Sequence, residues 1–208
     1  AKSKPPRRTA SSRDRQQREP IDVRARAEGW RSRADNTHQH IDKNETHHKP
    51  GMLVIDLGAA PGSRSQYITE KLQGRVRIIA LDQLEMDALP SVEFIQGDFR
   101  EDDVLENLAA ALGETRADLV ISDMAPNISG NKSVDQPRSM YLAELALDLC
   151  GRALKHGGNF VCKMFQGEGS DAFIASARQR FERVRVMKPE ASRPGSREVY
   201  LVARNYQL

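Results

Sequence analysis

From about residue 50 onward, short apolar runs alternate with segments whose apolar residues recur at helical spacing. Seven apolar runs predict strands: 52–57, 76–81, 92–95, 119–122, 159–164, 184–187 and 199–203. Helical spacing predicts four helices between or beside them: 65–72, 102–112, 138–154 and 171–181. Several strand runs are apolar throughout, which is typical of strands that are buried on both faces of a parallel sheet.

This alternation indicates one α/β domain with a doubly wound, mostly parallel sheet whose core starts at about residue 50. The loop between the last two strand runs is too short to hold a helix. We therefore expect these two runs to form an antiparallel hairpin at the edge of the sheet. The pattern contains no internal repeat, so a single domain accounts for residues 50–208.

The first 50 residues differ because they are poor in apolar residues and rich in charge. Residues 1–33 hold eleven Lys/Arg and four Asp/Glu, so this arm carries +7, whereas the remaining 175 residues carry −4. We expect 1–33 to be a largely disordered basic arm that contacts nucleic acid, and 34–208 to be the folded domain. Nucleic acid is the favoured partner, since phosphate binding draws on Lys/Arg charge. A solvated tail or an organellar transit segment is the alternative.

Length and composition exclude several classes of protein. The chain has 208 residues, 38% of them hydrophobic, and no run approaches the roughly 18 consecutive apolar residues of a membrane span. No basic start followed by an apolar run predicts a secretory signal. Cys150 and Cys162 lie twelve residues apart without a second pair, which favours neither a disulfide framework nor a thiolate zinc site. We expect a cytoplasmic protein with no membrane partner and no metal.

Candidate ligand-binding residues follow the first three predicted strands, because ligands of open α/β sheets bind outside the carboxyl ends of the strands. The first strand leads into the small-residue loop 58–62, the second into Asp82 and the third into Gly97, Asp98 and Phe99. The loop is neither a dinucleotide fingerprint nor a phosphate loop. A nucleoside cofactor without a pyrophosphate fits best, and S-adenosyl-L-methionine is the first candidate. A glycine turn with capping aspartates is the structural alternative.

Three further charged residues stand at the later strands. Asp123 follows the fourth, Lys163 lies within the apolar fifth and Glu198 opens the last. On a sheet of this topology they converge beside the cofactor, although a structural ion pair is the alternative. A charge that is buried needs partners in either case.

Six motifs in this order carry a family resemblance: DLGAAPG at 56–62, QGDF at 96–99, SDMAPN at 122–127, PR-x-MYL at 137–142, K-x-FQGEG at 163–169 and SR-x-x-SRE-x-Y at 192–200. Together they resemble the FtsJ/RrmJ family of ribose 2′-O-methyltransferases, from residue 29 to the C-terminus. The resemblance implies a Rossmann-like S-adenosylmethionine-dependent methyltransferase fold, with a mostly parallel seven-stranded sheet and an antiparallel edge strand.

The resemblance also implies roles for single residues. The cofactor-binding residues are Gly62, Arg64, Asp82, Asp98 and Asp123. Three members of a Lys-Asp-Lys-Glu catalytic tetrad match Asp123, Lys163 and Glu198, and the family's usual assignment makes this lysine the proton acceptor. Since a base must be neutral and two carboxylates favour an ammonium, an orienting role for a charged lysine is the alternative.

The implied activity is S-adenosylmethionine-dependent 2′-O-methylation of a uridine ribose in 23S ribosomal RNA, with the large ribosomal subunit as partner and a monomer as the active form. Two departures from the family pattern favour an alternative, which is a protein that binds cofactor and ribosomal RNA with weak or no turnover. Thr37 stands where the family has the first tetrad lysine, and Arg64 stands where it has a tryptophan. Lys43 is a candidate substitute for the lysine. A small-molecule methyltransferase is a third class.

The segment 35–48 contains four histidines and a single apolar residue, Ile41. We expect it to be exposed or remodelled rather than metal-binding.

Overall fold

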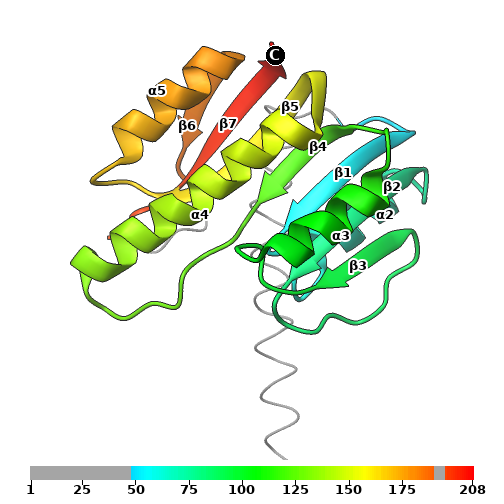
Figure 1. The fold of residues 1–208 in the computed structure, drawn as a ribbon, viewed down its shortest axis with the longest axis horizontal. Helices are drawn as coiled ribbons and strands as arrows, with labels where there is room; N and C mark the ends of the chain where they lie inside the picture. Colours follow the sequence, from blue (N-terminus) through cyan, green and yellow to red (C-terminus); the bar gives the residue numbers. More distant parts are fainter. Residues whose placement is uncertain (1–47, 190–194) are drawn as a thin grey trace, which may run out of the picture.

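The computed structural model describes residues 48–189 and 195–208. They form a seven-stranded sheet in the order β3-β2-β1-β4-β5-β7-β6 (Figure 1). Its strands are β1 Met52–Leu57, β2 Val76–Asp82, β3 Val92–Gln96, β4 Ala117–Ser122, β5 Leu154–Phe165, β6 Phe181–Met187 and β7 Glu198–Tyr206. Strands β1 to β5 pair in parallel, and β7 pairs antiparallel with both β5 and β6.

All seven predicted strands are present, and the final hairpin lies at the edge of the sheet as expected. The strand that runs antiparallel is β7, which lies one position in from the edge between β5 and β6. Strand β6 is therefore the edge strand and points in the same direction as β5. This arrangement brings residues from the very end of the chain next to β5.

Four helices connect the strands of the described residues: α2 Ser63–Lys71, α3 Asp102–Leu112, α4 Lys132–Ala153 and α5 Ser170–Arg180. Helix α4 begins six residues earlier than the predicted start at residue 138, and Pro137 lies inside it. The Asn131 side chain accepts a hydrogen bond from Ser133 N at 3.0 Å and caps the first turn. Gln136 is held by the carbonyl of Phe165 at 2.8 Å, so tertiary contacts carry the helix across the proline.

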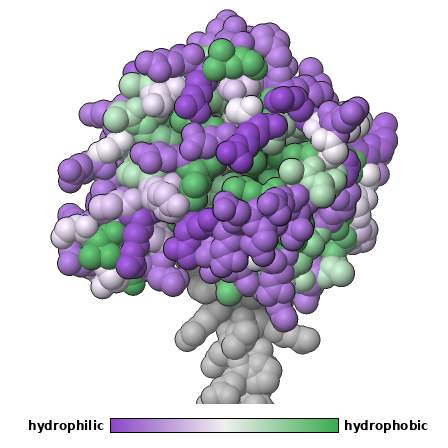
Figure 2. Space-filling view, viewed as in Figure 1, coloured by the Kyte–Doolittle hydropathy of each residue, from purple (hydrophilic) through white to green (hydrophobic). Residues whose placement is uncertain are grey.

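The helices cover the sheet unequally. Helices α3, α4 and α5 pack on one face and form the larger hydrophobic cluster, and α2 packs on the other (Figure 1). The surface over the first face is mostly hydrophilic, with apolar residues showing near its middle (Figure 2). Both cysteines, Cys150 and Cys162, lie in the larger cluster as free, fully buried thiols. They have a packing role.

The loop after β1 lies close to the loop after β4, because β1 and β4 are neighbours in the sheet. A Cβ atom at Gly58 would approach the backbone nitrogen of Met124 to 2.8 Å, and Gly58 has a φ of +71°. Only glycine fits both conditions. The carboxyl ends of β1 and β4, between which the chain changes direction across the sheet, are thereby brought together.

Part of the predicted organisation lies outside the described residues. The basic arm 1–33 and the segment 34–47, with Thr37 and Lys43, are among these. No helix in the described part of the chain is long and apolar enough to cross a membrane.

Candidate active site

A cavity of about 200 Å³ opens at the carboxyl edge of the sheet, where the ends of β1, β2, β3 and β4 meet. Its lining combines small residues, four larger apolar side chains and three carboxylates: Gly58, Ala60, Gly97, Ala125, Leu81, Phe99, Met124, Leu142, Asp82, Asp98 and Asp123, with Gln83. This is the switch point at which ligands of open α/β sheets bind.

Asp82 stands at the end of β2 and holds two loops in place. One carboxylate oxygen accepts the backbone N–H of Ala60 at 2.9 Å, and the other accepts that of Leu84 at 2.9 Å. Each carboxylate oxygen has two lone pairs, so both oxygens can still accept a hydroxyl from a ligand. Asp82 therefore fixes the cavity wall and also offers acceptors to a ribose.

Asp98 follows β3 and is paired with Arg100. The guanidinium contacts both carboxylate oxygens, at 2.9 Å and 2.6 Å, and the Arg100 N–H adds a third bond. These hydrogen bonds lower the pKa of the Asp98 carboxyl, so it is ionised at neutral pH. The neighbouring ring of Phe99 is 5% exposed and supplies an apolar surface on the same side of the cavity.

Asp123 is the centre of the site's charge network, and it follows β4. Its carboxylate accepts hydrogen bonds from the Tyr200 hydroxyl at 2.7 Å and from the guanidinium of Arg64. The Nζ atom of Lys163 lies 3.2 Å away. Burial raises the pKa of the Asp123 carboxyl, but Arg64 and Lys163 outweigh that effect and hold the pKa at about 2.

Lys163 and Glu198 meet because β5 and β7 are antiparallel neighbours. Lys163 pairs with Tyr200 across the two strands, and Glu198 lies two residues before Tyr200, on the same face of β7. The Lys163 Nζ atom is 3.8 Å from the Glu198 carboxylate. The Lys163 side chain is 16% exposed and that of Glu198 is 39% exposed. The ammonium is thus shielded from water while Glu198 faces the solvent side.

Arg64 occupies a buried position beneath the site, in the first turn of α2. Its Nη2 atom lies 2.8 Å from the Asp56 carboxylate and 2.8 Å from the carbonyl of Gly58, and its Nη1 atom reaches Asp123. Ser65 donates a further hydrogen bond to Asp56 at 2.8 Å. Burial disfavours the charged guanidinium, but Asp56 and Asp123 raise its pKa. Arg64 therefore ties the end of β1 to the end of β4.

The structure brings most of the predicted site residues together. Asp82, Asp98 and Asp123 line the cavity, and Lys163 and Glu198 adjoin it through Asp123. Among the described residues, the cavity lining does not include Gly62 or Arg64, which lie at and just inside the start of α2. Their contact with a cofactor stays a prediction.

Sequence reasoning missed two members of the network, Asp56 and Tyr200. Asp56 had a usable signal, since it is an acid within the apolar run 52–57, the same kind of signal that singled out Lys163. It is fully buried, and a buried charge requires partners. Tyr200 is the last residue of the motif SR-x-x-SRE-x-Y, but a tyrosine in a strand is by itself an ordinary packing residue, so it was given no role. The described ranges contain no group of three or more His, Cys, Asp or Glu that could hold a metal ion.

The lining of the cavity fits S-adenosylmethionine. Carboxylates attract the positive charges of its sulfonium and amino groups, and they accept ribose hydroxyls. Leu81, Phe99, Met124 and Leu142 offer apolar contact for a base. The glycine at 58 lets a ligand approach the backbone.

The strand order, with one antiparallel strand, and the cavity at the switch point define the S-adenosylmethionine-dependent methyltransferase fold. Human methyltransferase-like protein 13 in complex with SAH shares it, with a TM-score of 0.54 over 74% of this chain and 72% of that one, at 14% identity. Within this class, the chain belongs to the FtsJ-like methyltransferases, whose family model matches residues 30–206.

Curated relatives agree with this assignment over nearly their whole length. The chain is 53% identical over 185 residues to ribosomal RNA large subunit methyltransferase E of Legionella pneumophila (strain Corby), covering 89% of this chain and 90% of the relative. It is 50% identical over 189 residues to the protein of that name from Pseudomonas fluorescens (strain Pf0-1), covering 91% and 90%. A crystal structure of a ribosomal RNA methyltransferase from Plasmodium falciparum superposes with a TM-score of 0.76 at 30% identity, covering 85% and 98%.

Proposed function

We propose that this protein transfers a methyl group from S-adenosylmethionine to the 2′-hydroxyl of a uridine ribose in 23S ribosomal RNA, within the large ribosomal subunit. The observation that carries the proposal is the placement of Lys163 Nζ, 3.2 Å from Asp123 and 3.8 Å from Glu198, beside the cavity that fits the cofactor. The names of the relatives at 50% identity and above support ribosomal RNA as the substrate.

The cofactor-binding residues act by position and charge. S-adenosylmethionine, when bound, supplies an electrophilic methyl group on a positively charged sulfur. Asp82 would accept hydrogen bonds from the cofactor's ribose hydroxyls, and Asp98 with Phe99 would hold its adenine. Asp123 holds negative charge at the cavity wall, where its low pKa keeps it ionised. Gly62 begins α2 at a φ of +109°, where a Cβ atom would approach Leu89 to 3.0 Å.

Lys163 handles the proton of the reacting hydroxyl. In its neutral form it accepts that proton, and Asp123 and Glu198 hold the ammonium that results. Glu198, on the exposed side, also orients the amine toward the incoming RNA ribose.

Arg64 is a positioning residue for this chemistry, since it touches Asp123 and not the cavity. Without Arg64, Lys163 would face Asp123, Glu198 and the buried Asp56 as the single positive charge of the network. With it, Asp123 is held from below by a guanidinium and from above by Lys163. The arginine at the position of the family's tryptophan therefore adds a cation beside Asp123 and Lys163.

The test is single-turnover methyl transfer with labelled cofactor to three acceptors: isolated large subunits lacking the modification, naked 23S rRNA and a mixture of small hydroxyl compounds. We expect label in 23S rRNA, in an alkali-resistant dinucleotide that contains uridine, as a 2′-O-methyl group requires. Cofactor binding without transfer to any RNA would favour the binding-only alternative. Label only in small molecules would refute the RNA substrate.

We further infer that the protein acts as a cytoplasmic monomer, because the relatives that it matches are bacterial ribosomal RNA methyltransferases and the described site residues all come from one chain. Sedimentation at assay concentration tests the monomer. A dimer with transfer activity would overturn this part of the proposal and leave the reaction unaffected.

A further inference from the structure

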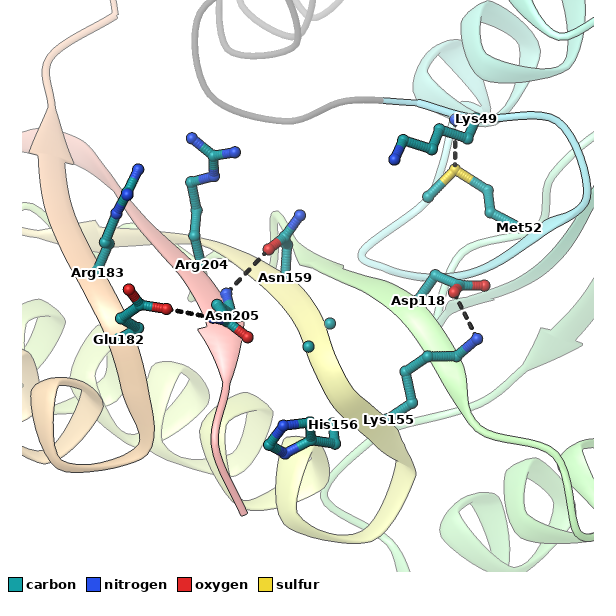
Figure 3. A pocket seen from close by; sticks show the side chains of 12 residues that line it. Lys49, Met52, Asp118, Lys155, His156, Asn159, Glu182, Arg183, Arg204 and Asn205 are labelled. Carbon is teal, nitrogen blue, oxygen red and sulfur yellow. Dashed lines mark hydrogen bonds and ion pairs between the residues drawn. The ribbon is translucent and has the colours of Figure 1, made fainter.

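A second cavity, about 450 Å³ in volume, lies at the opposite edge of the sheet. The starts of β4 and β6, the first half of β5 and the end of β7 form its walls (Figure 3). Asp118 in this cavity and Asp123 in the active site lie five residues apart on one chain segment, which is about 16 Å at the rise of a strand. This amino-edge groove is therefore separate from the cofactor site.

The groove carries a surplus of positive charge. Four of its lining residues are Lys or Arg and two are acidic, with one histidine beside them. Both acids already have partners: Asp118 pairs with Lys155 at 2.7 Å, and Glu182 accepts a hydrogen bond from Asn205. Three cations of the lining have no such partner: Lys49, Arg183 and Arg204. Their side chains make no hydrogen bond or ion pair within residues 48–189 and 195–208.

Arg183 and Arg204 are directly opposite each other on the antiparallel strands β6 and β7. Their side chains run side by side along one wall of the groove, with Asn159 beside them (Figure 3). Like charges directly opposite on a sheet are destabilising, so this pair has a cost in the free protein that an anion between the two guanidinium groups would remove.

The floor between these cations offers amide groups. Asn205 has a left-handed φ of +62°, and its backbone N–H donates to the Asn159 side chain at 3.1 Å. Gly157 has a φ of +83°, and a Cβ at Gly158 would come within 2.6 Å of Leu154. The glycines leave the floor open, and Lys155 and His156 stand at its far side (Figure 3).

We propose that the amino-edge groove binds the phosphodiester backbone of the substrate RNA at a second point, remote from the methylated ribose. Guanidinium forks match phosphate oxygens, and amides and lysines supply the further donors that position an RNA without reading its sequence. This inference rests on the proposed function, because that function makes a large folded RNA the partner that can reach both edges of one sheet.

The same features disfavour a membrane surface. Basic membrane-binding segments combine charge with apolar side chains that enter the bilayer. The large exposed apolar residues of the described chain are Leu84, Ile128, Tyr141 and Leu208, and none of them lines the groove. A concave polar site suits a narrow charged chain better than a flat headgroup layer.

The test compares two double variants of the full chain that remove the same charge. Arg183→Gln with Arg204→Gln empties the groove of its arginines, and Arg152→Gln with Arg178→Gln removes two exposed arginines from helices α4 and α5. Binding to transcribed 23S rRNA is measured as a function of salt. The groove pair should bind roughly tenfold more weakly near 0.1 M salt, with a slope of log K against log salt lower by about 1.4–1.8. The control pair should match the wild type.

Further variants and probes decide between explanations. Arg183→Lys with Arg204→Lys should retain most of the binding, since a lysine still contacts a phosphate as a point charge. Calorimetry with S-adenosylmethionine should give the same affinity for every variant, which verifies the fold. Equal losses in the groove and control pairs would overturn the proposal. The proposal would also be overturned if the groove pair lost binding to inorganic phosphate, or to vesicles with 30% phosphatidylglycerol, while its RNA binding stayed unchanged.

Methyl transfer by the wild type is measured in the same preparations, so that the two proposals fail separately. Transfer to 23S rRNA, together with an unchanged salt slope for the groove pair, would refute RNA binding in the groove and leave the proposed methyl transfer intact. RNA binding that depends on the groove, without any methyl transfer, would refute the proposed function and leave the groove as an RNA site.

Discussion

At the carboxyl edge of the sheet, Asp123 contacts Arg64, Lys163 and Tyr200, whereas at the amino edge Arg183 and Arg204 face each other without a carboxylate between them. At the first edge, Asp123 has oppositely charged partners within the protein, whereas the second edge leaves positive charge for a partner. Charged groups that are paired within the protein keep a reacting group in one geometry. Uncompensated charge on a rigid wall is the arrangement expected of a surface that binds a polyanion.

The largest effect is expected at the carboxyl edge, when the Lys163 amine is replaced by a permanent cation. Lys163→Arg keeps the charge toward Asp123 and Glu198 but cannot accept a proton, because arginine does not deprotonate in proteins. Single-turnover transfer should slow by about 10²–10⁴-fold, the usual worth of an acid–base group. A Lys163→Arg enzyme that transfers the methyl group at the wild-type rate would assign Lys163 an orienting role instead.

A second prediction contrasts the stability of the two edges. Arg64→Ala leaves Asp56 and Asp123 buried without their guanidinium, and we expect the free energy of unfolding to fall by about 3–5 kcal/mol. Arg204→Ala at the amino edge should change it by less than about 0.5 kcal/mol. Urea unfolding at pH 7 measures both.

Arg64→Lys is the control for folding, because it restores a charge without the fork and should recover part of the lost stability. If Arg64→Ala and Arg204→Ala proved equally mild, the carboxyl edge would not depend on internal pairing.

The third prediction separates the edges by pH. His48 precedes the groove residue Lys49 and is buried against Tyr67, and burial lowers the pKa of its imidazole to about 4. A group with a folded pKa below its unfolded value of about 6.5 is protonated first in the unfolded chain. Stability should therefore fall by about 2–3 kcal/mol as the pH drops from 6.5 to 4.

The Asp123 carboxyl, with a pKa of about 2, contributes stability that is lost only below about pH 4. His48→Leu should flatten the decline between pH 6.5 and 4 and leave the lower one unchanged. Urea unfolding at half-unit pH steps resolves the two declines. A His48→Leu curve parallel to the wild type down to pH 4 would remove the histidine from this account.

The smallest expected effect concerns the cofactor. Asp82→Ala should weaken S-adenosylmethionine binding by about 1.5–3 kcal/mol, the range for hydrogen bonds to a charged group. Glu106→Ala, which removes one exposed carboxylate from α3, is the matched control. Calorimetry measures both, with urea unfolding as a check because Asp82 also holds the backbone of Ala60 and Leu84. Unchanged affinity in a folded Asp82→Ala protein would exclude Asp82 from the site.

Much of the fold was predictable because its signals are local. The inner strands are largely apolar and the edge strands β3 and β6 still contain short apolar runs, so all seven strands were visible in the sequence. The glycine-rich loop after the first strand marked the ligand edge. Boundaries were less predictable: α4 runs through Pro137 because Asn131 and Gln136 support its start. Residues 35–48 were expected to be exposed or remodelled; the described part of the chain includes only the last of them, His48, which is buried.

The candidate site was likewise only partly predictable. The class of fold, the carboxylates after three strands and the unexplained lysine in an apolar strand were visible in the sequence. The contacts of Arg64 with Asp56 and Asp123, and of Tyr200 with Asp123, are visible only in the folded chain, as is the pairing of Arg183 with Arg204. The physical reason is range: periodicity and turns reflect neighbours along the chain, whereas the energy of a charge depends on which distant groups the packed sheet places within a few ångströms of it.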